Sequence, residues 1–217
     1  MSTPSSAQPP RKKATVVREY GPFPVERVHG VTHDGTHVWF AHGKQIAAMN
    51  PETGAIDREI EVPAQAGTAF DGRHLYQIGE DRIRKVDPKS GRVVATLAVP
   101  GMTNDNSGLT CDGETLWVGQ YKGRAIHQID ATTGKLLKTL RSDRFVTGVS
   151  FADGDLWHGT FEDETSELRR LDPATGRVLD ALEVPGGVSG VEAKGDLLFC
   201  GGIEAPVVRA VKRPART

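Results

Sequence analysis

The stretch Asp112-Gly113-Glu114-Thr115-Leu116-Trp117 decides the fold, because its pattern of a turn pair, an apolar residue and an aromatic residue recurs along the chain. At steps of 37, 41, 41 and 41 residues, the turn pairs are Asp34-Gly35, Asp71-Gly72, Asp112-Gly113, Asp153-Gly154 and Lys194-Gly195. The pairs that follow them are Val38-Trp39, Leu75-Tyr76, Leu116-Trp117, Leu156-Trp157 and Leu197-Leu198. A glycine precedes each turn by four or five residues, at Gly30, Gly67, Gly108, Gly148 and Gly190. A period of about 40 residues is typical of propeller blades.

A second turn marker stands in four of the five units. It reads Asn50-Pro51-Glu52-Thr53-Gly54, Asp87-Pro88-Lys89-Ser90-Gly91, Asp130-Ala131-Thr132-Thr133-Gly134 and Asp172-Pro173-Ala174-Thr175-Gly176. Asp-Gly supplies the positive φ of a tight hairpin, and Asp-Pro-x-Thr-Gly combines side-chain capping, a fixed φ and a closing glycine. Runs with strand-like alternation, such as residues 82–86 and 93–97, lie between the markers. The units therefore predict an all-β, five-bladed β-propeller with four antiparallel strands in each blade.

The last unit reaches the end of the chain without an outer strand. Residues 15–20 have the strand pattern that this unit lacks, so we expect residues 14–20 to complete blade five and close the ring. The predicted propeller spans residues 14–213, and its blades start near residues 27, 65, 106, 146 and 188. Residues 1–13 contain Ser, Pro and a basic cluster, and we expect them to form a disordered leader.

Composition and charge narrow the range of partners. The chain has 217 residues, 25 Gly, 13 Pro and a formal net charge of -1, so it lacks the basic surplus of a nucleic-acid binder. No stretch approaches the roughly 18 apolar residues of a membrane span, and the first 13 residues lack the apolar core of a secretion signal. We therefore expect a cytoplasmic monomer that binds neither nucleic acid nor membrane, with free thiols at Cys111 and Cys200.

The face of the ring on which the inner strands begin is where propellers usually hold their sites. The inner strands are predicted to open with His29, Ala66, Ser107, Thr147 and Ser189, and the second strands to end at His42, Gly79, Gln120, Thr160 and Gly201. Scaffold positions must repeat from blade to blade, whereas functional positions need not. Polar residues of this rim that differ between blades are therefore the candidates, and their ligand would be a small molecule or peptide in the central channel.

Three groups on this rim carry chemistry. His29 and His42, with Glu80 or Glu162, have the side chains for proton relay or metal binding, or they are hydrogen-bonded rim histidines. The acidic run at residues 162–164 supplies a general base or only a solvated loop. Residues 120–122, Gln-Tyr-Lys, form with Phe161 either an aromatic ligand wall or a packing pair of Tyr121 on Phe161. The tryptophans repeat in register and are expected to pack between blades.

Two segments resemble the glutamine cyclotransferase (glutaminyl-peptide cyclase) family of small five-bladed propellers. Residues 156–161, Leu-Trp-His-Gly-Thr-Phe, followed by 171–176, Leu-Asp-Pro-Ala-Thr-Gly, resemble that family's Ile-Trp-Ala-Asn-Val-Trp and Ile-Asp-Pro-x-Thr-Gly. Residues 29–31, His-Gly-Val, and 38–43, Val-Trp-Phe-Ala-His-Gly, resemble its Gln-Gly-Leu and Leu-Tyr-Glu-Ser-Thr-Gly. The likeness covers nearly the whole predicted propeller and implies a cyclase or acyltransferase activity on a small amine, amide or peptide terminus.

The chain departs from this family at positions that include the family's acid/base residue. The family's acid/base Glu falls on Phe40, its Asn on Gly159 and its second Trp on Phe161. A weaker resemblance runs to the streptogramin lyases, seven-bladed propellers that use His, Glu and Mg²⁺. The expected activity is therefore that of a cyclase-like transferase, with a non-catalytic binding propeller and a metal-dependent lyase as the alternatives.

The expected site residues follow from this reading. The acid/base candidates are His29, His42 and Glu162. The substrate-binding candidates are Arg27, Glu80, Asn106, Ser107, Gln120, Tyr121, Lys122, Thr160 and Phe161. No cofactor is expected, and a divalent metal at the rim belongs only to the lyase alternative.

Overall fold

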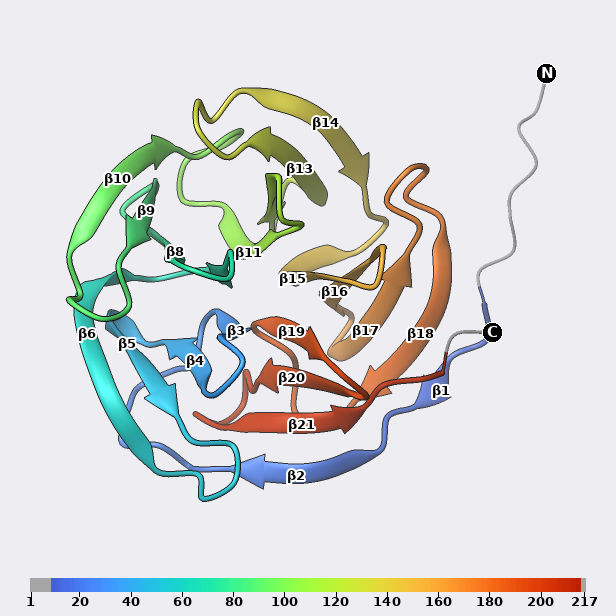
Figure 1. Cartoon of the computed structure of the whole chain (residues 1–217). Coiled ribbons are helices and arrows are strands. Elements are labelled where there is room, and N and C mark those ends of the chain that lie inside the picture. Colours follow the sequence, from blue (N-terminus) through green and yellow to red (C-terminus); the bar gives the residue numbers. More distant parts are fainter. Residues whose placement is uncertain (1–8, 216–217) are drawn as a thin grey trace.

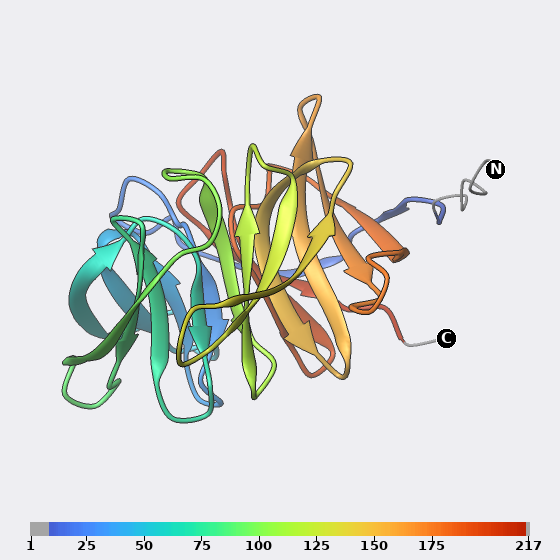
Figure 2. The same ribbon diagram turned by 90° about the horizontal axis from the view of Figure 1, so that it is seen from above.

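The computed structural model describes residues 9–215, and in that range the chain forms strands and no helices. The strands build five blades arranged in a ring (Figure 1). This confirms the all-β, five-bladed propeller that the repeat predicts. Seen edge-on, the ring is a disc with turns on both faces, and the hairpin between β16 and β17 stands above its neighbours (Figure 2). No helix in the described residues is long and apolar enough to cross a membrane.

In blades one to four, four strands that are consecutive in the chain pair antiparallel and are ordered from the centre of the ring to its edge. Blade one contains β3 (Val31–His33), β4 (Val38–Ala41), β5 (Gly43–Met49) and β6 (Ile56–Ala64). Blade two contains β7 (Thr68–Phe70), β8 (Leu75–Gly79), β9 (Arg82–Val86) and β10 (Val93–Ala98). Blade three contains β11 (Asn106–Cys111), β12 (Thr115–Gln120), β13 (Ala125–Asp130) and β14 (Leu136–Arg141). Blade four contains β15 (Phe145–Ala152), β16 (Asp155–Glu162), β17 (Thr165–Leu171) and β18 (Val178–Val184).

Blade five closes the ring with strands from both ends of the chain. Its inner strands are β19 (Val191–Lys194), β20 (Leu197–Gly201) and β21 (Val208–Lys212), and its outer strand is β2 (Val16–Tyr20). The pairing is antiparallel, with Val16 opposite Val211 and Tyr20 opposite Val208 (Figure 1). The predicted closure by an N-terminal strand is therefore confirmed.

The N-terminal leader needs a correction. Residues 1–8 lie outside the described residues, but Lys12–Lys13 form a short strand, β1, parallel to β18. Arg11 Nε lies 2.7 Å from Glu167 Oε1, and the amide of Ala14 donates to the carbonyl of Glu183 at 2.9 Å. Blade four thus has a fifth strand, and residues 11–14 are ordered by contact with it.

The repeated turn pair and aromatic residue are joined by a side-chain hydrogen bond. In blade one, Trp39 Nε1 donates to Asp34 Oδ2 at 2.7 Å while Asp34 Oδ1 accepts the amides of the turn. Blade three repeats this bond between Trp117 and Asp112 at 2.8 Å. In blade two, Tyr76 donates to Asp71 at 3.1 Å. In blades one to three, one aspartate therefore both closes the hairpin and fixes the aromatic ring that packs between blades.

The five repeated glycines form a ring around the axis of the propeller. A Cβ atom on any of them would lie no more than 2.7 Å from a backbone atom of the next blade. For Gly108 that atom is the amide nitrogen of Val149, and for Gly190 it is the carbonyl oxygen of His29, so the contacts pass from blade five back to blade one. These positions need glycine because the inner strands touch here, not because a turn requires it.

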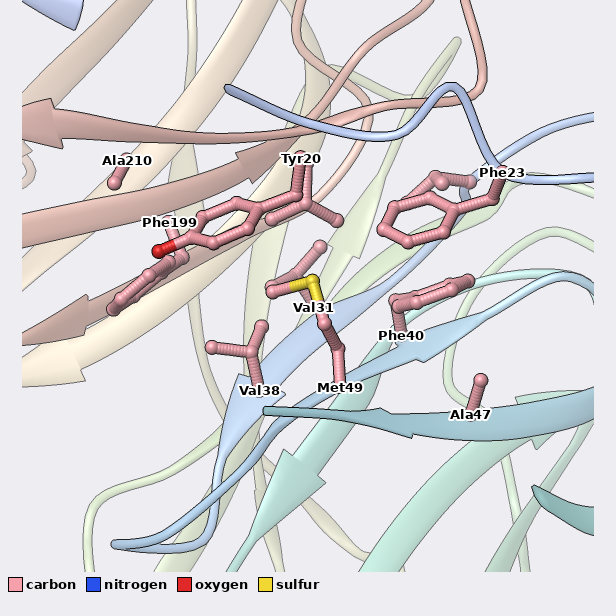
Figure 3. Close-up of a cluster of buried hydrophobic side chains, with 11 residues drawn as sticks. Tyr20, Phe23, Val31, Val38, Phe40, Ala47, Met49, Phe199 and Ala210 are labelled. Carbon is pink, nitrogen blue, oxygen red and sulfur yellow. The ribbon is translucent and has the colours of Figure 1, made fainter. Parts of the chain in front are cut away.

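The hydrophobic core lies in the seams between blades. The seam between blades five and one gathers Tyr20, Phe23, Phe40 and Phe199 around aliphatic side chains (Figure 3). Phe23 and Phe40 have their ring centroids 4.7 Å apart. This seam joins the N-terminal strand to both ends of the ring, so its packing secures the closure.

Candidate functional site

A cavity of about 300 Å³ lies at the face where the inner strands begin. Every blade contributes to it the residue that directly precedes its ring glycine: His29, Ala66, Ser107, Thr147 and Ser189. The other lining residues are Arg27, Gln65, Asn106, Tyr121, Phe161 and Ile203. The ring glycines bring the strands into contact, so the residues just before them surround the space above that contact.

His29 is the titratable group of this cavity that is best suited to acid/base chemistry near neutral pH. Its amide donates to the carbonyl of Ala41 at 2.8 Å, which fixes the backbone beside β4. Burial is the main cause that lowers the pKa of His29 below its ordinary 6.5; the charges of Arg27 and His42 lower it further, and Glu26 opposes them. The imidazole is therefore neutral at neutral pH and able to accept a proton.

Three hydroxyl groups of the cavity walls have no partner. The side-chain oxygens of Ser107, Thr147 and Ser189 are buried without a hydrogen bond in the described part of the chain. Each lies against a glycine of the second strand of its own blade, where a Cβ atom would approach the oxygen to 3.1 Å or less. A buried hydroxyl without a partner costs roughly 1–3 kcal/mol. A ligand that accepts or donates a hydrogen bond would relieve that cost after rotation about one side-chain torsion.

No carboxylate from the described residues lines this cavity. Glu162 Oε1 pairs with Arg124 Nη2 at 2.9 Å, and Glu80 Oε2 pairs with Arg84 Nη2 at 2.6 Å. Glu80 instead lines an adjoining cavity of about 380 Å³, which shares Gln65, Ala66 and Asn106 with the central one. The rim acids are thus held by arginines beside the central cavity and not inside it.

His42 is not among the residues that line the cavity. Its Nε2 lies 3.4 Å from Glu59 Oε1 on the outer strand of the same blade, without hydrogen-bond geometry, and its ring contacts Phe40. His42 still influences His29 through its charge. Of the three acid/base candidates, only His29 is in the lining; His42 lies beside Glu59, and Glu162 pairs with Arg124.

The substrate-binding candidates divide in the same way. Those that line the central cavity are Arg27, Asn106, Ser107, Tyr121 and Phe161. Gln120 does not, because its Nε2 donates to the carbonyls of Pro100 at 2.7 Å and Met102 at 3.3 Å and so fixes that loop. Thr160 is buried and accepts from Arg144 Nε at 3.1 Å. Lys122 is on the exposed turn after β12, where its amide donates to Asp105 at 2.6 Å.

Tyr121 packs against a different ring from the one expected. Tyr121 stacks on Phe145, with ring centroids 4.7 Å apart, and the guanidinium of Arg124 lies 4.3 Å from the centroid of the Phe145 ring. Phe145 is in turn opposite Phe161 in the β15–β16 ladder. Burial and then the charge of Glu162 raise the pKa of Tyr121 above 10.0, so its hydroxyl stays protonated and remains a donor.

The residues present do not fit a divalent metal. No three His, Cys, Asp or Glu side chains gather among residues 9–215 in a way that would hold an ion. His29 lines the cavity while His42 lies beside Glu59, and Glu80 and Glu162 are held by arginines. His158 is fully buried, and burial lowers its pKa to about 3, so it stays neutral inside blade four. We derive no step through a metal.

Sequence reasoning missed Gln65 and Ile203 among the lining residues. Gln65 stands two residues before the ring glycine of blade two, and Ile203 lies in the loop between β20 and β21. The position two residues before a ring glycine is the signal that finds Gln65, as it finds Asn106 in blade three. Ile203 is placed by a loop whose amide bonds to Gly186, and no repeat predicts that contact.

The family resemblance places an acid/base Glu where this chain has Phe40. Phe40 is 1% exposed, and its ring lies in the seam with Phe23 and Met49 (Figure 3). A carboxylate at this place would be buried among apolar side chains without a partner. Phe40 therefore supplies no acid/base group at this position.

Comparison with known proteins finds the same architecture elsewhere. Myxococcus xanthus glutaminyl cyclase superposes with a TM-score of 0.79 at 18% identity, over 94% of this chain and 98% of its own. Kuenenia stuttgartiensis hydrazine synthase superposes with a TM-score of 0.53 at 18% identity, over 82% of this chain and 56% of its own. Residues 79–179, less than half of the chain, match the family described as outer membrane protein assembly factor BamB. No curated protein sequence matches this chain. The chain thus has the five-bladed propeller fold of a glutaminyl cyclase.

Proposed function

We propose that the central cavity is the active site of a cyclase-like acyl transfer, in which a small amine attacks an amide and His29 moves the proton. One observation carries the proposal: a neutral, half-buried imidazole stands in the cavity around the axis of a fold shared with a glutaminyl cyclase. A group whose pKa lies near the operating pH is the best proton carrier.

The proton balance of such a cyclisation suits a single imidazole. The amine nitrogen bonds to the carbon of the side-chain carboxamide, and the bond from that carbon to the departing ammonia breaks. The attacking nitrogen must lose a proton, and the leaving nitrogen must gain one. His29 accepts the first proton as a neutral base and returns it to the leaving group, with no net change in the enzyme. The protonated hydroxyl of Tyr121 is the donor available to the oxygen that becomes negative between these steps.

A non-catalytic binding propeller is the second candidate. The observation that favours it is Phe40, which leaves the cavity without the carboxylate that the resemblance implies for proton transfer. The same cavity would then hold its ligand through hydroxyl and amide groups without turnover.

The test is ammonia release from glutaminyl peptides by the wild type and by His29→Gln. We expect the wild type to release ammonia, His29→Gln to lose at least roughly a hundredfold in kcat/KM, and the acid limb of the wild-type pH profile to lie below pH 6.5. His37→Gln is the matched control, because His37 lies in the turn of the opposite face and pairs with Asp57 at 3.1 Å. Saturable binding without ammonia release would contradict catalysis and support the non-catalytic binding function. Unchanged turnover in His29→Gln would remove His29 from the reaction.

A further inference from the structure

We infer that the cavity takes a short ligand with a free carboxylate, which Arg27 binds at the cavity mouth. The inference rests on the proposed function for the location of the site and for the amide end of the ligand. It adds the charge that the ligand carries and the residue that recognises it.

Arg27 is a cation without a protein partner. Within residues 9–215 its side chain has no hydrogen bond and no ion pair, although it lines the cavity and acts on His29 through its charge. Two other arginines of this face hold carboxylates instead: Arg84 holds Glu80 at 2.6 Å and Arg124 holds Glu162 at 2.9 Å. A guanidinium left free beside a cavity is suited to two parallel hydrogen bonds with a ligand carboxylate.

The charges around the cavity favour an anion at this end. Among residues 9–215, no Asp or Glu lines the cavity. The pKa of His29 is lowered, so Arg27 supplies the net charge of the cavity at neutral pH. Glu26 is the acidic neighbour of Arg27; it faces solvent and acts on His29 without forming an ion pair with Arg27. On the far side, Asp81 accepts from the amide of Asn104 at 2.9 Å and from Asn106 Nδ2 at 3.1 Å.

The depth of the polar groups sets the direction of the ligand. Arg27 is exposed, whereas the oxygens of Ser107, Thr147 and Ser189 are buried and without partners. A ligand with its amide toward these hydroxyls and His29 therefore leaves its other end at Arg27. A volume of about 300 Å³ lies at the small end of the range for ligand sites, so one molecule must be short to reach both ends. A glutaminyl dipeptide with a free C-terminus has both groups.

The experiment compares two probes that differ only in this charge: glutaminylglycine and its C-terminal amide. Titration calorimetry gives the affinity of each for the wild type, for Arg27→Gln and for Arg73→Gln. Arg73 is the matched control, since it is an exposed arginine beside the Asp71-Gly72 turn of the opposite face. We expect the wild type to bind the free acid roughly tenfold more tightly than the amide. The preference should disappear in Arg27→Gln and persist in Arg73→Gln.

The outcomes separate this inference from the proposed function. Equal affinity of the wild type for both probes, no binding of the free acid at millimolar concentration, or a preference that survives Arg27→Gln would each overturn the inference. A preference for the free acid without ammonia release supports the carboxylate site and counts against catalysis. Ammonia release at equal rates from both probes supports catalysis and refutes the carboxylate site. Equal thermal midpoints of the three proteins show that Arg27→Gln acts on the ligand and not on folding.

Discussion

Glu192 is a carboxylic acid at the centre of the ring, and it should make the stability of the propeller depend on pH. It lies on β19, two residues after the ring glycine of blade five, and its Oε2 accepts a hydrogen bond from Ser150 Oγ of blade four at 3.2 Å. A second bond comes from the hydroxyl of Thr32 in blade one. Burial raises the pKa of Glu192 from 4.5 to about 8, although these bonds and the charge of Lys194 oppose the rise. The side chain is therefore protonated in the native protein at neutral pH.

The sign and size of the effect follow from proton linkage. Between pH 4.5 and about 8 the native state holds a proton that the unfolded chain has released, so the free energy of unfolding falls as pH rises through this range. At about 1.4 kcal/mol per pH unit, the upper limit is roughly 4–5 kcal/mol. Glu192 is partly exposed, which reduces the effect below this limit. We expect the free energy of unfolding to fall by about 2–4 kcal/mol across this pH range.

Glu192→Gln tests this because it keeps the shape and hydrogen bonds of the side chain while removing its proton equilibrium. Urea unfolding at pH 5, 7 and 9 should give similar stability for the two proteins at pH 5. At pH 9 the variant should be the more stable, by about 2–4 kcal/mol. Glu183→Gln, a change of an exposed glutamate on β18, should follow the wild-type curve. Parallel pH curves for the wild type and Glu192→Gln would refute the reasoning.

Two further predictions concern the repeat itself. Trp117→Phe should destabilise the protein by about 1 kcal/mol more than Trp157→Phe, because Trp117 Nε1 donates to Asp112 whereas Trp157 Nε1 has no partner within the described residues; equal urea midpoints for the two variants would contradict this. Gly108→Ala should cost more than about 2 kcal/mol, because its Cβ would lie 2.5 Å from the amide nitrogen of Val149. Ser107→Ala, which removes an unpartnered hydroxyl next to it, should stay within about 1 kcal/mol of the wild type, and a tolerated Gly108→Ala would show that the inner strands have room to separate.

The fold was predictable because the repeated turn residues and aromatic residues act locally. Asp112 accepts the turn amides three residues or fewer away, and Trp117 is five residues away. Such contacts leave their mark at a fixed spacing in the sequence, and the bond to the turn aspartate recurs in three blades. The β1 strand leaves no such mark. It has two polar residues, and it pairs with β18 more than 160 residues later, so neither alternation nor spacing indicates it.

The site was predictable only where it coincides with the repeat. The residues before the ring glycines line the cavity, because the glycine contacts fix their position around the axis. Of the candidates expected at the ends of the second strands, His42, Gln120 and Thr160 do not line the cavity. The register of β11 with β12 shifts between Asn106 and Leu109, and Gly43 follows His42 with a φ of +95°. A one-residue shift or a left-handed residue reverses the side to which a strand-end side chain points, and neither can be counted from the sequence.

The same geometry explains where a propeller of this kind acquires chemistry. Position 40 lies in the seam that closes the ring, so a carboxylate there would be buried among Phe23, Met49 and other apolar side chains. The residue before a ring glycine instead lines the cavity, and the glycine after it makes the contact between blades. Four blades place alanine, serine or threonine at this position, and blade one places His29. Under the function that we propose, His29 at this repeat position is the change that gives the scaffold a proton acceptor without disturbing its seams.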